Sequence, residues 1–108
     1  MKQVLIICAA GMSSSLMAKK TTDYLKNNNY NIEIEAVSLN EGHKKIEKSN
    51  YDLFLVSPQT KMNYKDLKKA GDRQSKPVIN IPAQAYVPIQ MGIEKLGKLI
   101  LDELPEDD

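Results

Sequence analysis

Two uninterrupted runs of apolar residues, at 4–10 and at 53–56, constrain the fold of this chain more than any other feature. Short apolar runs, the first of them rich in valine and isoleucine, are typical of strands that a parallel sheet buries on both faces. The longer run is far below the roughly 20 residues that a membrane-spanning helix needs. We therefore expect central strands at residues 2–8 and 53–56, and no integral membrane segment.

The residues outside these runs follow the spacing of helices or of half-exposed strands. Residues 32–37 alternate apolar side chains with glutamates, which predicts a strand at a sheet edge, and residues 78–81 predict a shorter strand. Asn40 is expected to cap the second helix. The expected helices cover residues 13–27, 40–48, 62–75 and 89–104. One face of the last helix is expected to be apolar and to consist of Ile89, Ile93, Leu96, Ile100 and Leu104.

Strands and helices thus alternate along the chain, and this alternation predicts an α/β fold with a parallel sheet and helices on both faces. The two purely apolar strands belong in the middle, which gives the strand order 2-1-3-4. We expect a single domain over residues 1–108, folded as a three-layer α/β/α sandwich with a four-stranded parallel sheet. In such a sheet, ligands bind beyond the carboxyl ends of the strands, where the strand order reverses. Cys8 ends the first strand at that point.

The charge and the cysteine content exclude several classes of function. Fifteen lysines and arginines oppose fourteen aspartates and glutamates, so the net charge of +1 offers no field that would hold nucleic acid. One cysteine cannot form an internal disulfide, and with one histidine it cannot supply the usual zinc ligands. The uninterrupted apolar run before Cys8 has only four residues, too few for a secretory signal. We expect a cytoplasmic protein with no metal and no other cofactor.

The segment from Cys8 to Ser15 carries the chemistry that we expect. It joins the end of a buried strand to the start of a helix, where free backbone N–H groups and the helix dipole favour an anion. Small residues and Gly11 let the backbone curve around that anion, and three serines add hydroxyl donors. Cys8 is therefore the candidate nucleophile. The candidate phosphate-binding residues are Ala9, Ala10, Gly11, Met12, Ser13, Ser14 and Ser15.

Other interpretations of Cys8 differ in what they require. A lone cysteine at the end of a core strand is often just a small buried hydrophobic residue, but packing gives no reason for the donors that follow it here. A thiol redox role needs a second cysteine to resolve an intermediate. A phosphatase with the pattern Cys-x5-Arg-Ser of the low-molecular-weight tyrosine phosphatases needs an arginine where this chain has Ser14. A cysteine that accepts a phosphoryl group and hands it on fits the residues best. A small phosphatase-like protein or a noncatalytic anion-binding module is the alternative.

Over nearly its whole length the chain resembles the enzyme IIB components of the bacterial sugar phosphotransferase system (PTS), of the lactose and cellobiose (chitobiose) type. The resemblance rests mainly on residues 8–16, CAAGMSSSL, with support from residues 55–59, 81–82 and Tyr86. It implies a fold like that of the low-molecular-weight tyrosine phosphatases. It also implies that Cys8 takes a phosphoryl group from a phosphohistidine on a IIA component and passes it to a sugar on the membrane IIC permease. The family suggests a β-linked disaccharide such as cellobiose, chitobiose or lactose.

Three further residues near the same end of the sheet are candidates for a pocket wall or a partner contact: Pro58, Gln59 and Tyr86. Turn geometry explains Pro58 equally well, and Tyr86 can simply cover the end of the core. His43 is expected on a solvated helix face, away from the site. Because no apolar surface stripe is evident, we expect a monomer that forms transient complexes at the inner face of the cell membrane.

Overall fold

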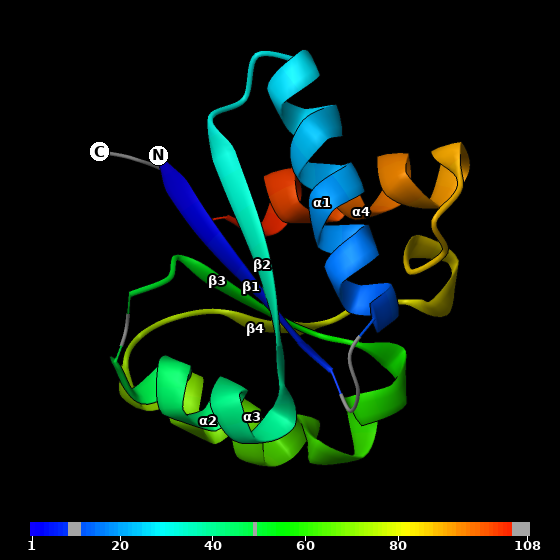
Figure 1. Ribbon diagram of the computed structural model, residues 1–108. Coiled ribbons are helices and arrows are strands. Elements are labelled where there is room, and N and C mark those ends of the chain that lie inside the picture. Colours follow the sequence, from blue (N-terminus) through cyan, green and yellow to red (C-terminus); the bar gives the residue numbers. More distant parts are fainter. Residues whose placement is uncertain (9–11, 49, 105–108) are drawn as a thin grey trace.

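The structure is a computed structural model that describes residues 1–8, 12–48 and 50–104, without the side chains of Met12 and Ser13. Its strands and helices alternate along the chain (Figure 1). The strands are β1 (Lys2–Cys8), β2 (Ile32–Ser38), β3 (Leu53–Val56) and β4 (Val78–Asn80). The α-helices are α1 (Met12–Asn27), α2 (Leu39–Lys48), α3 (Tyr64–Arg73) and α4 (Gln90–Glu103). The 3-10 helices are η1 (Pro58–Asn63) and η2 (Ala83–Ala85).

The strands form one parallel sheet in the order β2-β1-β3-β4, so the predicted strand order is confirmed. β1 pairs with β2 along its whole length, and Cys8 lies beside Ser38. On its other side, β1 pairs with β3 only as far as Ile7, which lies beside Val56. The strand pairing therefore reaches the cysteine on the β2 side and stops one residue before it on the β3 side.

Helices cover both faces of this sheet, with α1 and α4 on one face and α2 and α3 on the other (Figure 1). The side chains of β1 alternate between the two layers. Val4 and Ile6 pack in the layer of α1 and α4, whereas Leu5 and Ile7 pack in the layer of α2 and α3. All four are fully buried, and burial of such a side chain contributes about 1.5–3 kcal/mol. The prediction of a three-layer sandwich around a strand that is apolar on both faces is confirmed.

The second helix and the helical region after β3 start differently from the predictions. α2 begins one residue earlier than predicted, and the N–H of Glu41 points at the hydroxyl of Ser38, 3.5 Å away, so the predicted cap at Asn40 is wrong. Ser38 takes this role because it ends β2 and faces the free N–H groups of the first helical turn. The single helix predicted at 62–75 is η1 followed by α3, because Pro58 begins a tight turn directly after β3.

The apolar face of α4 is shorter than predicted. Ile93, Leu96 and Ile100 are buried against the sheet as expected. Ile89 is 61% exposed, because it precedes the helix in an extended conformation and is out of phase with that face. Leu104, just after the helix, is also extended and only partly buried.

Gly42 allows α2 to approach the central strand closely. A Cβ atom at this position would lie 2.7 Å from Cγ2 of Ile7. Ile7 directly precedes Cys8, so a larger side chain at position 42 would push against the strand end that carries the cysteine.

Tyr51, between α2 and β3, ties the edge strand β2 to the core. Its hydroxyl donates to Oε2 of Glu35 at 2.5 Å, and its ring packs against Phe54 with the ring centroids 5.8 Å apart. The ammonium nitrogen of Lys45 lies 5.7 Å from the centroid of the Tyr51 ring. Burial, followed by the hydrogen bond to Glu35 and the negative charge of Glu35, raises the pKa of Tyr51 to about 12.

Two adjacent buried threonines of α1 give opposite predictions for stability. The Thr21 hydroxyl is fully buried and has no hydrogen-bond partner in the described part of the chain, so Thr21→Val is expected to raise the free energy of unfolding by about 1 kcal/mol. The Thr22 hydroxyl donates to the carbonyl of Ala18 at 2.7 Å and accepts the N–H of Ile34 at 3.1 Å. Thr22→Val is expected to lower the same free energy by about 1–2 kcal/mol. Urea denaturation measures both changes, and shifts of the same sign would contradict these assignments.

The hydrogen bond between Tyr51 and Glu35 predicts a pH-dependent stability. The folded protein holds the Tyr51 proton up to about pH 12, whereas an unfolded tyrosine ionises near its ordinary value of 10.0. Below pH 10 the contribution of Tyr51 is therefore fully present, and it is lost as the pH rises towards 12. Near neutral pH the wild type is expected to exceed Tyr51→Phe by about 1 kcal/mol in unfolding free energy, and this difference should shrink at alkaline pH. Urea denaturation at several pH values measures it, and a difference that stays constant would contradict the prediction.

Candidate functional site

Cys8 is the last residue of β1 and lies at the carboxyl end of the sheet, beside the point where the strand order reverses. Only 3% of its surface is exposed. Helix α1 begins at Met12 and brings its first turn against the sulfur. Ala9, Ala10 and Gly11, predicted to curve around an anion, lie outside the described residues. The described site therefore consists of the strand end, the start of α1, and the segments that follow β3 and β4.

Ser14, in the first turn of α1, lies against the cysteine. Its Oγ lies 2.8 Å from Sγ of Cys8, and Ser14 is only 1% exposed. The carbonyl oxygen of Val37 in β2 lies 3.5 Å from the same sulfur and accepts the proton of the thiol. Among the described residues, the sulfur thus has a hydroxyl group and a carbonyl group as polar neighbours, and little of its surface is exposed.

Tyr86 follows η2 and forms a hydrogen bond with the side chain of Ser14. Burial raises the pKa of the Tyr86 phenol, the bond with Ser14 opposes this rise, and the charge of Cys8 adds to it. The residue is largely buried, at 9% exposure. Tyr86, Ser14 and Cys8 therefore form a connected series of polar groups that involves the segment after β4, helix α1 and strand β1.

The other predicted residues lie around this series. Ser15 is exposed on α1, while Met12 and Ser13 contribute helix backbone and their side chains lie outside the described set. The helix therefore begins one residue earlier than predicted. Pro58, which is partly buried, and Gln59, which is exposed, begin η1 directly after β3, at the same end of the sheet as the cysteine.

Ser57 and Thr60, which flank Pro58 and Gln59, were not predicted from the sequence. Both are buried, and their hydroxyl oxygens lie 3.0 Å apart. The Thr60 hydroxyl also lies 3.1 Å from the carbonyl oxygen of Ile7, the residue before the cysteine. A serine followed three residues later by a threonine, directly after an apolar strand, is a pattern that indicates hydroxyl-to-backbone bonding and could have pointed to them.

His43 lies on α2 and is partly buried, so the prediction of a solvated side chain is wrong. Within residues 1–8, 12–48 and 50–104, no group of three or more His, Cys, Asp or Glu side chains could hold a metal ion. None of the helices in these ranges is long and apolar enough to cross a membrane.

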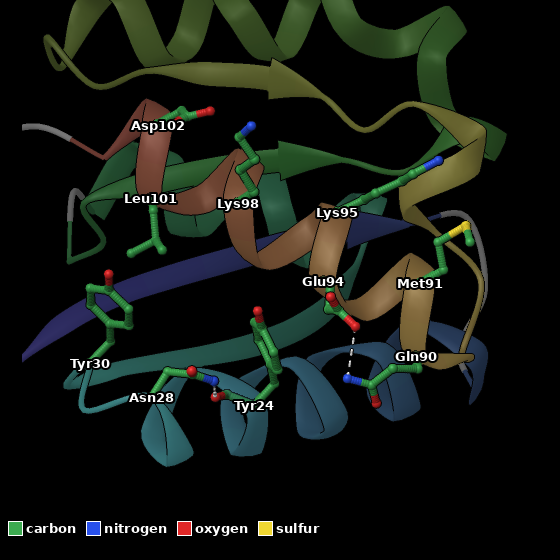
Figure 2. A pocket seen from close by; sticks show the side chains of 10 residues that line it. All are labelled: Tyr24, Asn28, Tyr30, Gln90, Met91, Glu94, Lys95, Lys98, Leu101 and Asp102. Atoms are coloured by element: carbon green, nitrogen blue, oxygen red, sulfur yellow. Dashed lines mark hydrogen bonds between the residues drawn. The ribbon is translucent and has the colours of Figure 1, made fainter.

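A groove of about 940 Å³ lies between α1 and α4, away from the cysteine. Figure 2 shows Tyr24 and Tyr30 on one side of it and Leu101 and Lys98 on the other. Two of its polar side chains bond to residues four positions earlier or later in the chain: Asn28, just after α1, donates to the carbonyl of Tyr24, and Gln90 donates to Glu94 within α4. The groove contains none of the predicted site residues and is distinct from the site around the cysteine.

The amino-acid sequence matches a known family and a characterised relative. The family described as PTS system, Lactose/Cellobiose specific IIB subunit, matches residues 3–98. The oligo-beta-mannoside-specific EIIB component of the PTS of Bacillus subtilis (strain 168) is 31% identical over 86 residues, which make up 80% of this chain and 82% of that protein.

Solved structures with the same fold include two IIB domains. The lactose-specific IIB component domain from Streptococcus pneumoniae has a TM-score of 0.81 at 17% identity, over 94% of this chain and 96% of that chain. The cellobiose-specific phosphotransferase IIB component from Borrelia burgdorferi has a TM-score of 0.72 at 27% identity, over 95% of this chain and 91% of that chain. The predicted α/β sandwich, which resembles the low-molecular-weight phosphatase fold, is therefore confirmed.

The series Tyr86–Ser14–Cys8 predicts opposite effects of two substitutions on one titration. Ser14→Ala is expected to raise the pKa of Tyr86 further, because the hydrogen bond that opposes burial is removed. Cys8→Ser is expected to lower it, because the charge on the sulfur is removed. NMR titration of protein labelled with ¹³C at the tyrosine Cζ measures both shifts. Shifts in the same direction would show that the three side chains are not connected in this way.

Proposed function

Because this chain belongs to the lactose/cellobiose-specific IIB family of the phosphotransferase system, we propose that it carries a phosphoryl group on Cys8 between two partners. The donor is a phosphohistidine of a IIA component, and the acceptor is a sugar bound by a IIC permease. The family as a whole serves sugar phosphotransfer. The reacting residue, the groups that hold the phosphoryl group and the kind of sugar are our proposal.

The observation that supports Cys8 as the carrier is its sulfur, at the end of β1, 2.8 Å from the Ser14 hydroxyl in the first turn of α1. In the first transfer, the thiol loses its proton, the thiolate attacks phosphorus, the S–P bond forms and the P–N bond to the donor histidine breaks, and the leaving imidazole takes up a proton in place of the one that the thiol lost. In the second transfer, a sugar hydroxyl attacks phosphorus, the S–P bond breaks, and the sulfur leaves as a thiolate. The hydroxyl proton passes to a base outside this chain or to water.

The partial positive charge at the N-terminus of α1 supports a phosphorylated state of Cys8. Phosphorylation adds close to two negative charges, and the free N–H groups and dipole of a helix N-terminus stabilise an anion there by about 0.3–1 kcal/mol. We propose that the backbone N–H groups of residues 9–13 complete the binding site. The hydroxyls of Ser13, Ser14 and Ser15 are the side-chain donors. This set needs no metal ion.

The serine at position 14 also distinguishes this chain from phosphatases, which hydrolyse the phosphoryl group. Phosphatases with the Cys-x5-Arg-Ser pattern clamp the phosphoryl group with a guanidinium at this position, and a bidentate clamp stabilises the transition state for attack by water. Here the position carries a neutral hydroxyl that is also hydrogen-bonded to Tyr86. A weaker clamp suits a group that must survive until the sugar arrives.

The names of the relatives support our proposal for the kind of sugar. The Bacillus subtilis relative is named for oligo-β-mannosides, and the solved domains are named for lactose and cellobiose. We propose a β-linked disaccharide or short oligosaccharide as the acceptor. The chain would then work in the cytoplasm as a monomer and meet the permease transiently at the inner face of the membrane. Pro58 and Gln59 are proposed to contact these partners.

The test is intact-mass spectrometry after incubation with phosphoenolpyruvate, the general phosphotransfer proteins and a IIA component. The wild type is expected to gain one phosphoryl mass and to release it as sugar phosphate when permease membranes and a β-linked disaccharide are added. Cys8→Ser is expected to gain none, while Thr22→Val, a substitution of a residue that bridges α1 and β2, should still be phosphorylated.

Three outcomes would contradict the proposal. An equal phosphoryl gain in Cys8→Ser would move the acceptor to another residue. Rapid turnover of an aryl phosphate would indicate a phosphatase. Reversible binding of inorganic phosphate, with no covalent adduct from any of several IIA donors, would indicate an anion-binding module.

A further inference from the structure

Two groups of the segment that follows β3 contact the carbonyl oxygen of Ile7. The N–H of Ser57 donates to it at 3.0 Å, which extends the strand pairing. The hydroxyl of Thr60 lies 3.1 Å from the same oxygen and also 3.1 Å from the carbonyl oxygen of Ser57. The Ile7 carbonyl belongs to the peptide group whose nitrogen is that of Cys8. These contacts therefore fix the orientation of the last peptide group before the cysteine.

Thr60 reaches this carbonyl because η1 folds back on itself. Its N–H donates to the carbonyl of Ser57 at 3.0 Å, and the Ser57 hydroxyl lies 3.0 Å from the Thr60 hydroxyl, so the two hydroxyls share one buried network. Thr60 is 1% exposed and Ser57 is fully buried. Pro58 and Gln59 lie between them in the turn, at the carboxyl end of the sheet. One hydroxyl thus connects the cysteine-bearing strand end to the turn proposed to contact partners.

The position of this network matches a gap in the strand pairing. Cys8 is paired with β2 through Ser38, while pairing with β3 ends at Ile7. Beyond that point the strand end is held on the β3 side by Thr60 and Ser57. The sulfur is correspondingly held on the β2 side by its contact with the Val37 carbonyl at 3.5 Å.

We propose that Thr60 is a positioning residue for phosphoryl transfer, which acts by holding the Ile7–Cys8 peptide group and the Pro58–Gln59 turn in a fixed relation. This inference rests on the proposed function of Cys8 for its effect on transfer. Its effect on the sulfur itself does not depend on that function. In-line transfer between two proteins depends on the direction of attack, and small displacements of a reacting atom slow such reactions by one to two orders of magnitude.

The hydrogen bonds of the Thr60 hydroxyl determine which substitutions test this inference. Thr60→Val keeps the shape of the side chain and removes the hydroxyl, whereas Thr60→Ser keeps the hydroxyl. Thr60→Val also leaves the buried Ser57 hydroxyl without this partner, which lowers stability on its own account. The double variant Ser57→Ala/Thr60→Val removes both hydroxyls and restores much of that stability, but it does not restore the contact between position 60 and the Ile7 carbonyl, which keeps only its bond from the Ser57 N–H. Thr22→Val is the matched control, since it removes another buried, hydrogen-bonded threonine hydroxyl, between α1 and β2.

Two rates are measured for each variant: phosphorylation of Cys8 by the IIA donor, and alkylation of the unphosphorylated thiol by iodoacetamide. Phosphorylation of Thr60→Val and of the double variant is expected to be roughly tenfold slower than in the wild type. Alkylation is expected to be several-fold faster, because the buried sulfur is held less firmly. Thr60→Ser should restore both rates to within about twofold, and Thr22→Val should change neither despite its lower unfolding midpoint.

The outcomes separate positioning from stability alone. Transfer rates that follow the unfolding midpoints of the variants, with recovery in the double variant or an equal loss in Thr22→Val, would overturn the inference. Unchanged alkylation in Thr60→Val would also overturn it. If the wild type itself takes no phosphoryl group, the proposed function fails, and the alkylation rates still decide whether Thr60 positions the sulfur.

Discussion

Burial of a single strand on both of its faces is the constraint on which the rest of this structure depends. The four residues of β1 before the cysteine are fully buried in two separate helix layers, so the strand cannot shift towards either layer without opening voids. Cys8 follows them directly. Packing therefore fixes the strand up to Ile7, and the polar contacts of Thr60 with the Ile7 carbonyl, and of Ser14 and Val37 with the sulfur, act at the end of a strand that is already in place.

The sequence predicted the bounds of a strand correctly where the strand is buried on both faces. The bounds of β1 and β3 agree with the expected strands, because a strand buried on both faces shows an unbroken apolar run. The first residues of the helices were harder to predict. Ser38 and Asn40 are both good capping residues, and the choice between them depends on the backbone at the strand-to-helix junction. Ile89 fitted the helical spacing but precedes the helix, in extended conformation.

The candidate site was predictable where its residues are neighbours in the chain, and less so where they are not. Cys8 and Ser14 belong to one short segment with an unusual composition, yet the sequence could not single out Ser14 among three serines. The phase of α1 separates Ser14, which it buries against the cysteine, from Ser15, which it exposes. Thr60 meets a carbonyl 53 positions away in the chain, and such a contact exists only once β1 and β3 are paired.

The hydrogen bond from the Ile34 N–H to the Thr22 hydroxyl affects whether copies of this molecule can aggregate through β2. β2 is a seven-residue edge strand, and the open N–H and C=O groups of a long edge invite strand addition and aggregation. Thr22 occupies the Ile34 N–H, and Glu33 and Glu35 place two carboxylates along the same strand. A second copy adding its own β2 would meet a donor already in use and bring like charges together. The edge is thus protected against the permanent association that would remove a carrier from circulation.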